Sequence, residues 1–116
     1  MNQFQRAQQL WSILVLAAKY RHILTYAEVA KAIGAPTPAL GAWLEPVQAY
    51  CVRNGLPALT SLIVSEVTGL PGAGFTAAAD VPAAQMRAFA HEWFHGQAPN
   101  AADLEVVVTA VAPHRG

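Results

Sequence analysis

The stretch that decides the fold is LTYAEVAKAIGAPTPALGAWL, residues 24–44. In this stretch Thr25 is followed three residues later by Glu28, which is the spacing of a capping box at the start of a helix. Apolar residues then recur at helical spacing, and Gly34 is a typical residue for ending a helix. The pattern therefore predicts a short helix over residues 26–33.

A second helical segment begins after a tight break. Thr37 is an N-cap candidate, and Pro38 suits the first helical position because that position has no use for an amide proton. Pro46 lies inside the following apolar pattern, where a proline removes a hydrogen bond and clashes with the preceding turn. The sequence therefore predicts one helix that ends near Leu44 and another that runs to Arg53.

A longer helix is expected before this pair, over residues 3–20, because apolar residues recur there at three- and four-residue spacing. After the pair the chain changes character. Apolar and β-branched residues over 59–67 lead into the turn TGLPGAG at residues 68–74. This pattern predicts a β-strand, a turn and a second short strand near residues 74–76.

The last part of the chain is expected to add a helix over residues 81–95, which Gly96 ends, and a strand in the valine-rich run at 106–111. Two helices joined by a tight turn and followed by a hairpin describe a winged helix-turn-helix. We therefore expect a single α+β domain over residues 1–116, a winged helix-turn-helix with an added C-terminal helix and strand.

Composition supports one compact domain. The chain has 116 residues, of which 54% are hydrophobic and 12% charged, enough for one core but not two. The formal net charge is zero, so binding to nucleic acid or to an anionic membrane would need a local patch. The single cysteine, Cys51, excludes an internal disulfide and favours a reducing compartment. The apolar run at residues 13–18 is too short to span a bilayer, so we expect a cytoplasmic protein without a membrane partner.

One part of the sequence is similar to a known family. TYAEVAKAIGAP…ALGAWL, within residues 25–44, resembles the TYGELA…G.P.AARAVG.AL segment of alkylguanine-DNA alkyltransferases and alkyltransferase-like proteins. SLIVSEVTGLPGAGF, residues 61–75, resembles their wing, a hydrophobic strand that runs into a glycine-rich turn. The resemblance covers residues 23–76. It implies a winged-helix domain whose second helix of the helix-turn-helix, here about 37–44, enters a DNA groove.

The chain departs from that family at the reactive position. Those enzymes carry Pro-Cys-His-Arg where this chain has LTSL at residues 59–62, so the thiol that accepts the alkyl group is missing. Alkyl transfer is therefore not expected. Cys51 lies upstream without an adjacent histidine and is expected to be a small core residue. The family's arginine in the recognition helix is also absent, and PALGAWLEPVQAY at 38–50 carries only Glu45 as a charged residue, which weakens the inference of DNA binding.

A binding surface is expected on residues 37–50 and on the turn 68–74, since the recognition helix and the wing of a winged helix project from the same side. Its predicted members are Thr37, Leu40, Trp43, Glu45, Gln48, Leu70, Pro71 and Gly72. Some basic residues would contact phosphates if folding brought them together, and would otherwise be ordinary solvated charges. These basic residues are Lys19, Arg21, Lys31 and Arg53.

The stretch RAFAHEWFHG, residues 87–96, contains the pattern H-E-x-x-H. On a helix, His91 and His95 could hold one zinc ion while Glu92 activated the metal-bound water. On a helical wheel, however, both histidines fall opposite an apolar stripe, and no third ligand is indicated. The predicted stripe consists of Met86, Phe89, Ala90 and Trp93. The pattern therefore favours a solvated helix face, with zinc as an alternative.

The sequence as a whole predicts a non-catalytic winged-helix binding protein without cofactor or metal, a regulator associated with nucleic acid. One alternative is a protein-binding inhibitor of a defence complex, a phage or mobile-element protein of the anti-CRISPR kind, because size, neutral charge and an apolar recognition segment suit a protein or nucleoprotein partner. The other alternative is a small zinc peptidase that uses His91, Glu92 and His95. A homodimer is left open. Salt dependence separates the first two, because only binding through Lys and Arg falls steeply with salt.

Overall fold

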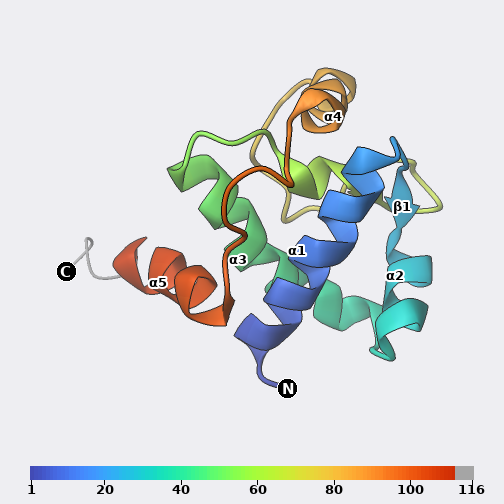
Figure 1. Cartoon of the computed structure of the whole chain (residues 1–116). Helices are drawn as coiled ribbons and strands as arrows, with labels where there is room; N and C mark the ends of the chain where they lie inside the picture. The colour runs from blue at the N-terminus through green and yellow to red at the C-terminus, as the bar shows by residue number, and fades with distance from the viewer. Residues whose placement is uncertain (112–116) are drawn as a thin grey trace.

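The first helix, α1 (Gln3–Lys19), runs through the middle of the molecule, and the other helices pack around it (Figure 1). The structure, a computed structural model, describes residues 1–111. Asn2 begins α1 through a capping box with Gln5, which satisfies amide protons that have no partner inside the helix. The helix confirms the prediction for residues 3–20. Its buried residues are Ala7, Leu10, Trp11, Leu14, Val15, Ala17 and Ala18.

The next two elements follow the sequence signals closely. A short strand, β1 (Leu24–Thr25), leads directly into α2 (Tyr26–Ile33). The Glu28 amide donates to the Thr25 hydroxyl over 3.2 Å, and the Thr25 amide donates to the Glu28 carboxylate over 2.7 Å. Gly34 takes a left-handed φ of 66° and ends the helix. The capping box and the glycine stop are therefore confirmed.

A 3₁₀ turn, η1 (Thr37–Ala39), precedes α3 (Leu40–Arg53), which is one continuous helix. The predicted break at Pro46 is wrong. Pro46 is buried inside α3, and α3 packs against both α1 and the C-terminal helix, so tertiary packing outweighs the one hydrogen bond that a proline removes. The predicted N-cap role of Thr37 is also wrong, because no side chain caps η1 or α3.

The segment predicted as a hairpin folds differently. It forms a second 3₁₀ turn, η2 (Leu59–Leu62), then a short strand, β2 (Ile63–Val64), and then a loop over residues 65–80. β2 pairs with β1 in parallel, with Leu24 opposite Ile63. No strand forms at 74–76, and the described residues contain no antiparallel hairpin. The reason is burial on both sides, because a run of apolar residues without alternation suits an enclosed parallel strand better than a solvated wing.

α4 (Val81–Ala90) is shorter than the predicted helix over 81–95. Asp80 caps its first turn by accepting a hydrogen bond from the Ala83 amide over 3.0 Å. The helix ends at His91, whose ψ of 143° is extended. The H-E-x-x-H pattern therefore lies in a turn and not on a helix.

α5 (Ala101–Val111) occupies the run that was predicted as a strand. Valines favour strands locally, but Asn100 and Asp103 exchange hydrogen bonds of 2.9 and 3.0 Å that start a helix here. Leu104 and Val107 are then buried in the contact of α5 with α1 and α3. Tertiary burial on a helical stripe thus outweighs β propensity.

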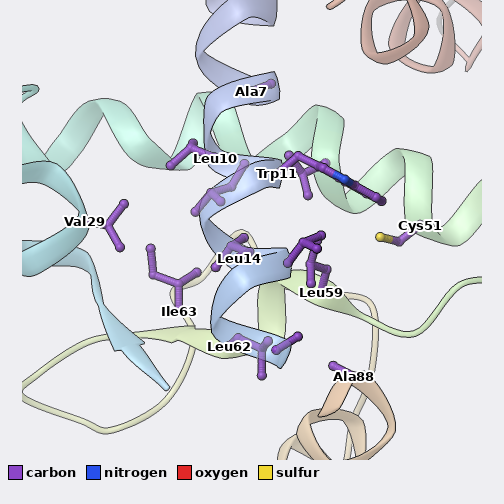
Figure 2. Packing of buried hydrophobic residues seen from close by; sticks show 14 of the residues in the cluster. Ala7, Leu10, Trp11, Leu14, Val29, Cys51, Leu59, Leu62, Ile63 and Ala88 are labelled. Carbon is purple, nitrogen blue, oxygen red and sulfur yellow. The ribbon is translucent and has the colours of Figure 1, made fainter. Parts of the chain in front are cut away.

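The hydrophobic core lies where α1 meets α2, α3, α4, η2 and α5. Figure 2 shows Leu10 and Leu14 of α1 within the same apolar cluster as Leu59, Leu62 and Ile63. The fold class is α+β, as expected, with a two-stranded parallel sheet among the helices. None of the helices in the described part combines the length and the apolar character that crossing a membrane requires.

Candidate functional site

A pocket of about 500 Å³ lies between α3 and the loop 72–76. This volume falls within the range of roughly 300–1,000 Å³ that is usual for ligand sites. Among the described residues that line it, Glu45 is the only acidic side chain and none is Lys, Arg or His. The lining residues are Tyr26, Thr37, Gly41, Leu44, Glu45, Gln48, Thr60, Gly72, Ala73, Gly74, Phe75 and Thr76.

The N-terminal half of α3 supplies one wall of this pocket. Leu44 and Glu45 follow Gly41 by three and four residues, and Gln48 follows them by four and three, so the four residues share one face of the helix. Leu44 is buried and gives this wall an apolar base, whereas the exposed Glu45 lies at the rim. A Cβ at Gly41 would meet no atom within 4 Å, so a larger side chain at this position would extend into open space.

The loop 72–76 forms the opposite wall, and three hydrogen bonds hold it. The side-chain amide of Gln48 donates to the Gly74 carbonyl over 3.2 Å and accepts from the Thr76 amide over 2.9 Å. The Gly72 amide donates to the hydroxyl of Tyr26 over 2.7 Å. Gln48 and Tyr26 therefore act as positioning residues, which keep a loop without secondary structure at a set distance from α3.

Thr60 brings a buried hydroxyl to the base of the pocket. Its side chain is 5% exposed, and Oγ1 has no hydrogen-bond partner among the described residues. A buried hydroxyl without a partner costs about 1–3 kcal/mol of stability. The neighbouring Ser61 is satisfied, because its hydroxyl donates to the Ala58 carbonyl over 2.7 Å. Since buried polar groups in folded proteins are nearly always paired, the unpaired Thr60 hydroxyl is suited to a bound molecule.

The structure brings half of the predicted binding surface to this pocket. The members that line it are Thr37, Glu45, Gln48 and Gly72. Leu40 is a correction, because its side chain is completely buried in the core and offers no surface. Trp43 is half-buried and holds the guanidinium of Arg6 at 5.2 Å from its ring centre. Leu70 is exposed and Pro71 half-buried, directly before the loop 72–76.

The basic residues predicted to contact phosphates do not gather in one place. Lys19 and Arg21 lie at the C-terminal end of α1, and Lys31 lies in the last turn of α2. Arg53 ends α3, which has 14 residues, so it lies about 20 Å along that helix from the end that follows α2. All four are exposed, and none of them lines the pocket.

The three residues of the H-E-x-x-H pattern also lie apart from the pocket. His91 is half-buried, and its ring centre lies 4.4 Å from that of Trp93. Glu92 and His95 are exposed in the turn that follows α4. Within residues 1–111 no three potential metal-ligating side chains come together. Without the helix that the pattern requires, the arrangement of a zinc peptidase is not formed.

The apolar stripe predicted for this region is partly wrong. Met86 and Ala90 are exposed, and α4 buries Ala84 and Ala88 in their place. Trp93 is buried as predicted, although it enters the core from a turn. The helical wheel failed within α4 because the helix turns the face with Ala84 and Ala88 to the core, whereas Trp93, beyond the end of the helix, is buried without following helical spacing.

Four lining residues, Tyr26, Thr60, Phe75 and Thr76, lie outside the two segments that were predicted to bind, 37–50 and 68–74. Thr60 had a signal, since the family resemblance aligns it with the alkyl-accepting cysteine. Tyr26 had none, because its contact with Gly72 joins positions 46 residues apart. Cys51 is a core residue, as expected, and burial raises the pKa of its thiol from the usual 9.0 to about 11.

Comparison of the chain with protein-family models, with curated proteins and with solved structures gave no match.

Proposed function

We propose that this chain is a non-catalytic binding protein associated with nucleic acid, and that its pocket receives an unpaired base. One observation carries the proposal. Residues from 37–50 and from the turn 68–74, the two segments expected to face a partner, line the same pocket around the unpaired hydroxyl of Thr60. In the winged-helix interpretation these two segments are the recognition helix and the counterpart of the wing.

The chemistry of the lining suits a base better than a phosphate. A phosphate needs cationic side chains or clustered amide protons, and no Lys, Arg or His is among the described lining residues. A base is uncharged and planar, with apolar faces and a polar edge. Leu44 and Phe75 offer apolar contacts, and the hydroxyls of Tyr26 and Thr60 offer hydrogen bonds to the edge.

The same residues argue against a reaction on the bound group. Thr60 stands where the resembling enzymes carry their cysteine, and a threonine hydroxyl is a weak nucleophile unless a base activates it. Ser61 and Leu62 stand where those enzymes carry histidine and arginine. The Ser61 hydroxyl already donates to the Ala58 carbonyl, and Leu62 is completely buried. Binding without chemistry is therefore the role that this pocket supports.

The scattered basic residues define the kind of nucleic acid that would bind. With Lys31 and Arg53 separated by the length of α3, few phosphates can be contacted at once, so the salt dependence of binding should be shallow. Weak backbone binding contributes little free energy toward opening a base pair. The preferred target is consequently a base that is already unpaired, for which extrusion costs least.

The proposal is tested with a labelled duplex that carries a single-base bulge, with each of the four bases in turn, and with an abasic sugar at the same position. Fluorescence anisotropy measures the affinity of the purified protein. The best-bound bulge should bind about tenfold more tightly than the abasic duplex, since stacking and edge contacts of one base contribute about 1–3 kcal/mol.

Two neighbouring variants show whether the pocket is responsible. Gly41→Phe places a ring in the open space of the pocket, whereas Ala42→Phe places the same ring on an exposed position of α3 outside it. Gly41→Phe should remove the preference over the abasic duplex, and Ala42→Phe should keep it. Circular dichroism checks that both variants fold. Equal affinity of the wild type for all bulges and for the abasic duplex would overturn the proposal.

A second candidate is the protein-binding inhibitor of a defence complex. It is favoured by exposed apolar side chains in the loop that leads to residues 72–76, Val67 at 89% and Leu70 at 53%. Such a surface would bind a protein with little response to salt, and Val67→Ser with Leu70→Ser should weaken that complex. Under the base-binding proposal the same two substitutions leave the affinity for the bulged duplex unchanged.

A further inference from the structure

Glu45 differs from the other polar side chains that line the pocket in one respect, the direction of its hydrogen bonds. A hydroxyl can donate or accept, so Thr37, Thr60 and Thr76 impose no direction on a ligand, and the Tyr26 hydroxyl, which already accepts from the Gly72 amide, keeps its proton for donation. Gln48 could do both, but its amide already donates to Gly74 and accepts from Thr76. An ionised carboxylate can only accept. Glu45 is thus the lining side chain that requires a hydrogen-bond donor on the ligand.

The surroundings of Glu45 keep this preference intact. None of the described lining residues is Lys, Arg or His, so no cationic side chain of the pocket competes for the carboxylate. Glu45 lies on the same face of α3 as Gly41, where the space is open. A ligand that enters this space with an amino group toward the rim gains a hydrogen bond to the carboxylate. A carbonyl oxygen in the same place is repelled by it.

We infer that the pocket selects bases that carry an amino group at the pyrimidine 4-position or the purine 6-position, cytosine and adenine, over bases with a carbonyl oxygen there, and that Glu45 is the specificity-determining residue. The inference rests on the proposed function and names the class of base that the site takes. Acceptance of the cytosine amino group by Glu or Asp is an established mode of base recognition. The hydroxyls of Tyr26 and Thr60 adapt to the rest of the edge, because each can rotate its proton.

Two matched pairs of bases compare an amino group beside an acceptor ring nitrogen with a carbonyl oxygen beside a ring N–H. Cytosine and uracil differ by an amino group against a carbonyl oxygen at the same ring position, and adenine and hypoxanthine differ in the same way. Each base is placed in the same single-base bulge, so that the backbone, the charge and the size are held constant. The wild type should bind the amino member of each pair about tenfold more tightly, the lower end of what one good base contact discriminates.

Substitution of Glu45 then assigns the preference. Glu45→Leu should bring the two members of each pair to equal affinity by weakening the amino member. Glu45→Gln should keep part of the preference, since an amide oxygen still accepts a hydrogen bond. Glu66→Leu removes an exposed carboxylate outside the pocket and should leave the preference unchanged.

The outcomes separate this inference from the function on which it rests. Suppose that the wild type prefers a base over the abasic duplex, that Gly41→Phe abolishes this preference, and that the wild type binds both members of each pair equally. The inference about Glu45 is then overturned and the proposed function stands. A preference that survives in Glu45→Leu overturns the role of Glu45. If no bulge binds better than the abasic duplex, both are overturned.

Discussion

The amide of Gly72 donates a 2.7 Å hydrogen bond to the hydroxyl oxygen of Tyr26, and a Cβ at position 72 would lie 2.9 Å from the same oxygen. The loop 72–76 can therefore approach α2 this closely only because residue 72 has no side chain. Together with the two bonds from Gln48, this contact determines where the wall of the pocket stands. The shape of the pocket thus depends on a pair of residues that are distant in the sequence.

Tyr26→Phe and Gly72→Ala should each weaken the loop contact, the first by removing the acceptor and the second by displacing the tyrosine ring. Each should lower the free energy of unfolding by about 1 kcal/mol, as measured by urea denaturation. The double variant should lose clearly less free energy of unfolding than the two single variants lose together, because both changes disrupt one contact. Gly74→Ala is the control, since its Cβ would meet no atom within 4 Å. Fully additive losses would contradict the shared contact.

Thr60→Val should stabilise the protein while it weakens ligand binding. Valine keeps the shape of threonine and removes a buried hydroxyl that has no partner among the described residues, so unfolding should require about 1 kcal/mol more. The affinity for a bulged duplex should fall, because the hydroxyl is then missing from the pocket. Thermal unfolding and anisotropy measure the two effects on the same sample. A destabilised Thr60→Val protein would show that the hydroxyl is already paired in the folded chain.

Trp93→Ala should be strongly destabilising, by about 3–5 kcal/mol, because removing a buried ring leaves a cavity. Trp93 is 9% exposed, donates through Nε1 to the Ala88 carbonyl over 2.7 Å, and packs edge-on against Trp11 at 5.6 Å. The adjacent Phe94 is 56% exposed, and Phe94→Ala should change stability by no more than about 0.5 kcal/mol. A denaturant titration measures the free energy of unfolding of both variants. Similar losses for Trp93→Ala and Phe94→Ala would mean that the Trp93 ring is not buried in the core.

Cys51 should make the protein less stable in alkaline solution. Burial raises the pKa of its thiol from 9.0 to about 11, so the folded chain keeps a proton that the unfolded chain releases. The free energy of unfolding therefore falls as pH rises from 9 toward 11, by about 2–3 kcal/mol from this group, and is unaffected by it below pH 9. Cys51→Ala removes this contribution, so its stability should decline less steeply over the same range. Urea unfolding at pH 8 and at pH 10.5 measures the loss of stability of each protein between these two values. An equal loss for the wild type and for Cys51→Ala would contradict the raised pKa of Cys51.

The same burial should keep the thiol unreactive. At neutral pH the folded chain holds Cys51 protonated and 1% exposed, so a thiol reagent should modify it only at the rate at which the chain opens. Addition of denaturant should restore ordinary reactivity. Fast modification of the native protein at pH 7 would show that the thiol is accessible.

Local signals in the sequence determined where several helices begin and end. The capping box of Thr25 and Glu28 and the stop at Gly34 were predicted because their hydrogen bonds and backbone angles involve residues within a few positions. The stripe of α1 was readable for the same reason, since a helix repeats its buried face every three or four residues. Burial of Cys51 was predicted because no histidine lies beside it to make the thiol reactive, which left a small core residue as the simplest role.

Tertiary structure alone decided the elements whose local preference was weak or contradicted. The valines of α5 favour a strand although Asn100 and Asp103 cap a helix, and contact with α1 and α3 decides for the helix by burying Leu104 and Val107. Pro46 remains within α3 because packing on two sides outweighs one lost hydrogen bond. The parallel pairing of β1 with β2 joins segments separated by α2 and α3, and no local pattern specifies that pairing.

The candidate site, too, was determined partly by local sequence and partly by tertiary structure. Residues 37–50 and the turn 68–74 were predicted to face a partner from the expected winged helix and from the glycine-rich composition of the turn. These segments line one pocket with Tyr26 and Thr60 through contacts between residues 26 to 46 positions apart, such as Gly72 with Tyr26 and Gln48 with Gly74. Side-chain spacing along a helix reports only which residues share a face. Which loop then covers that face is decided by the packing of the whole chain.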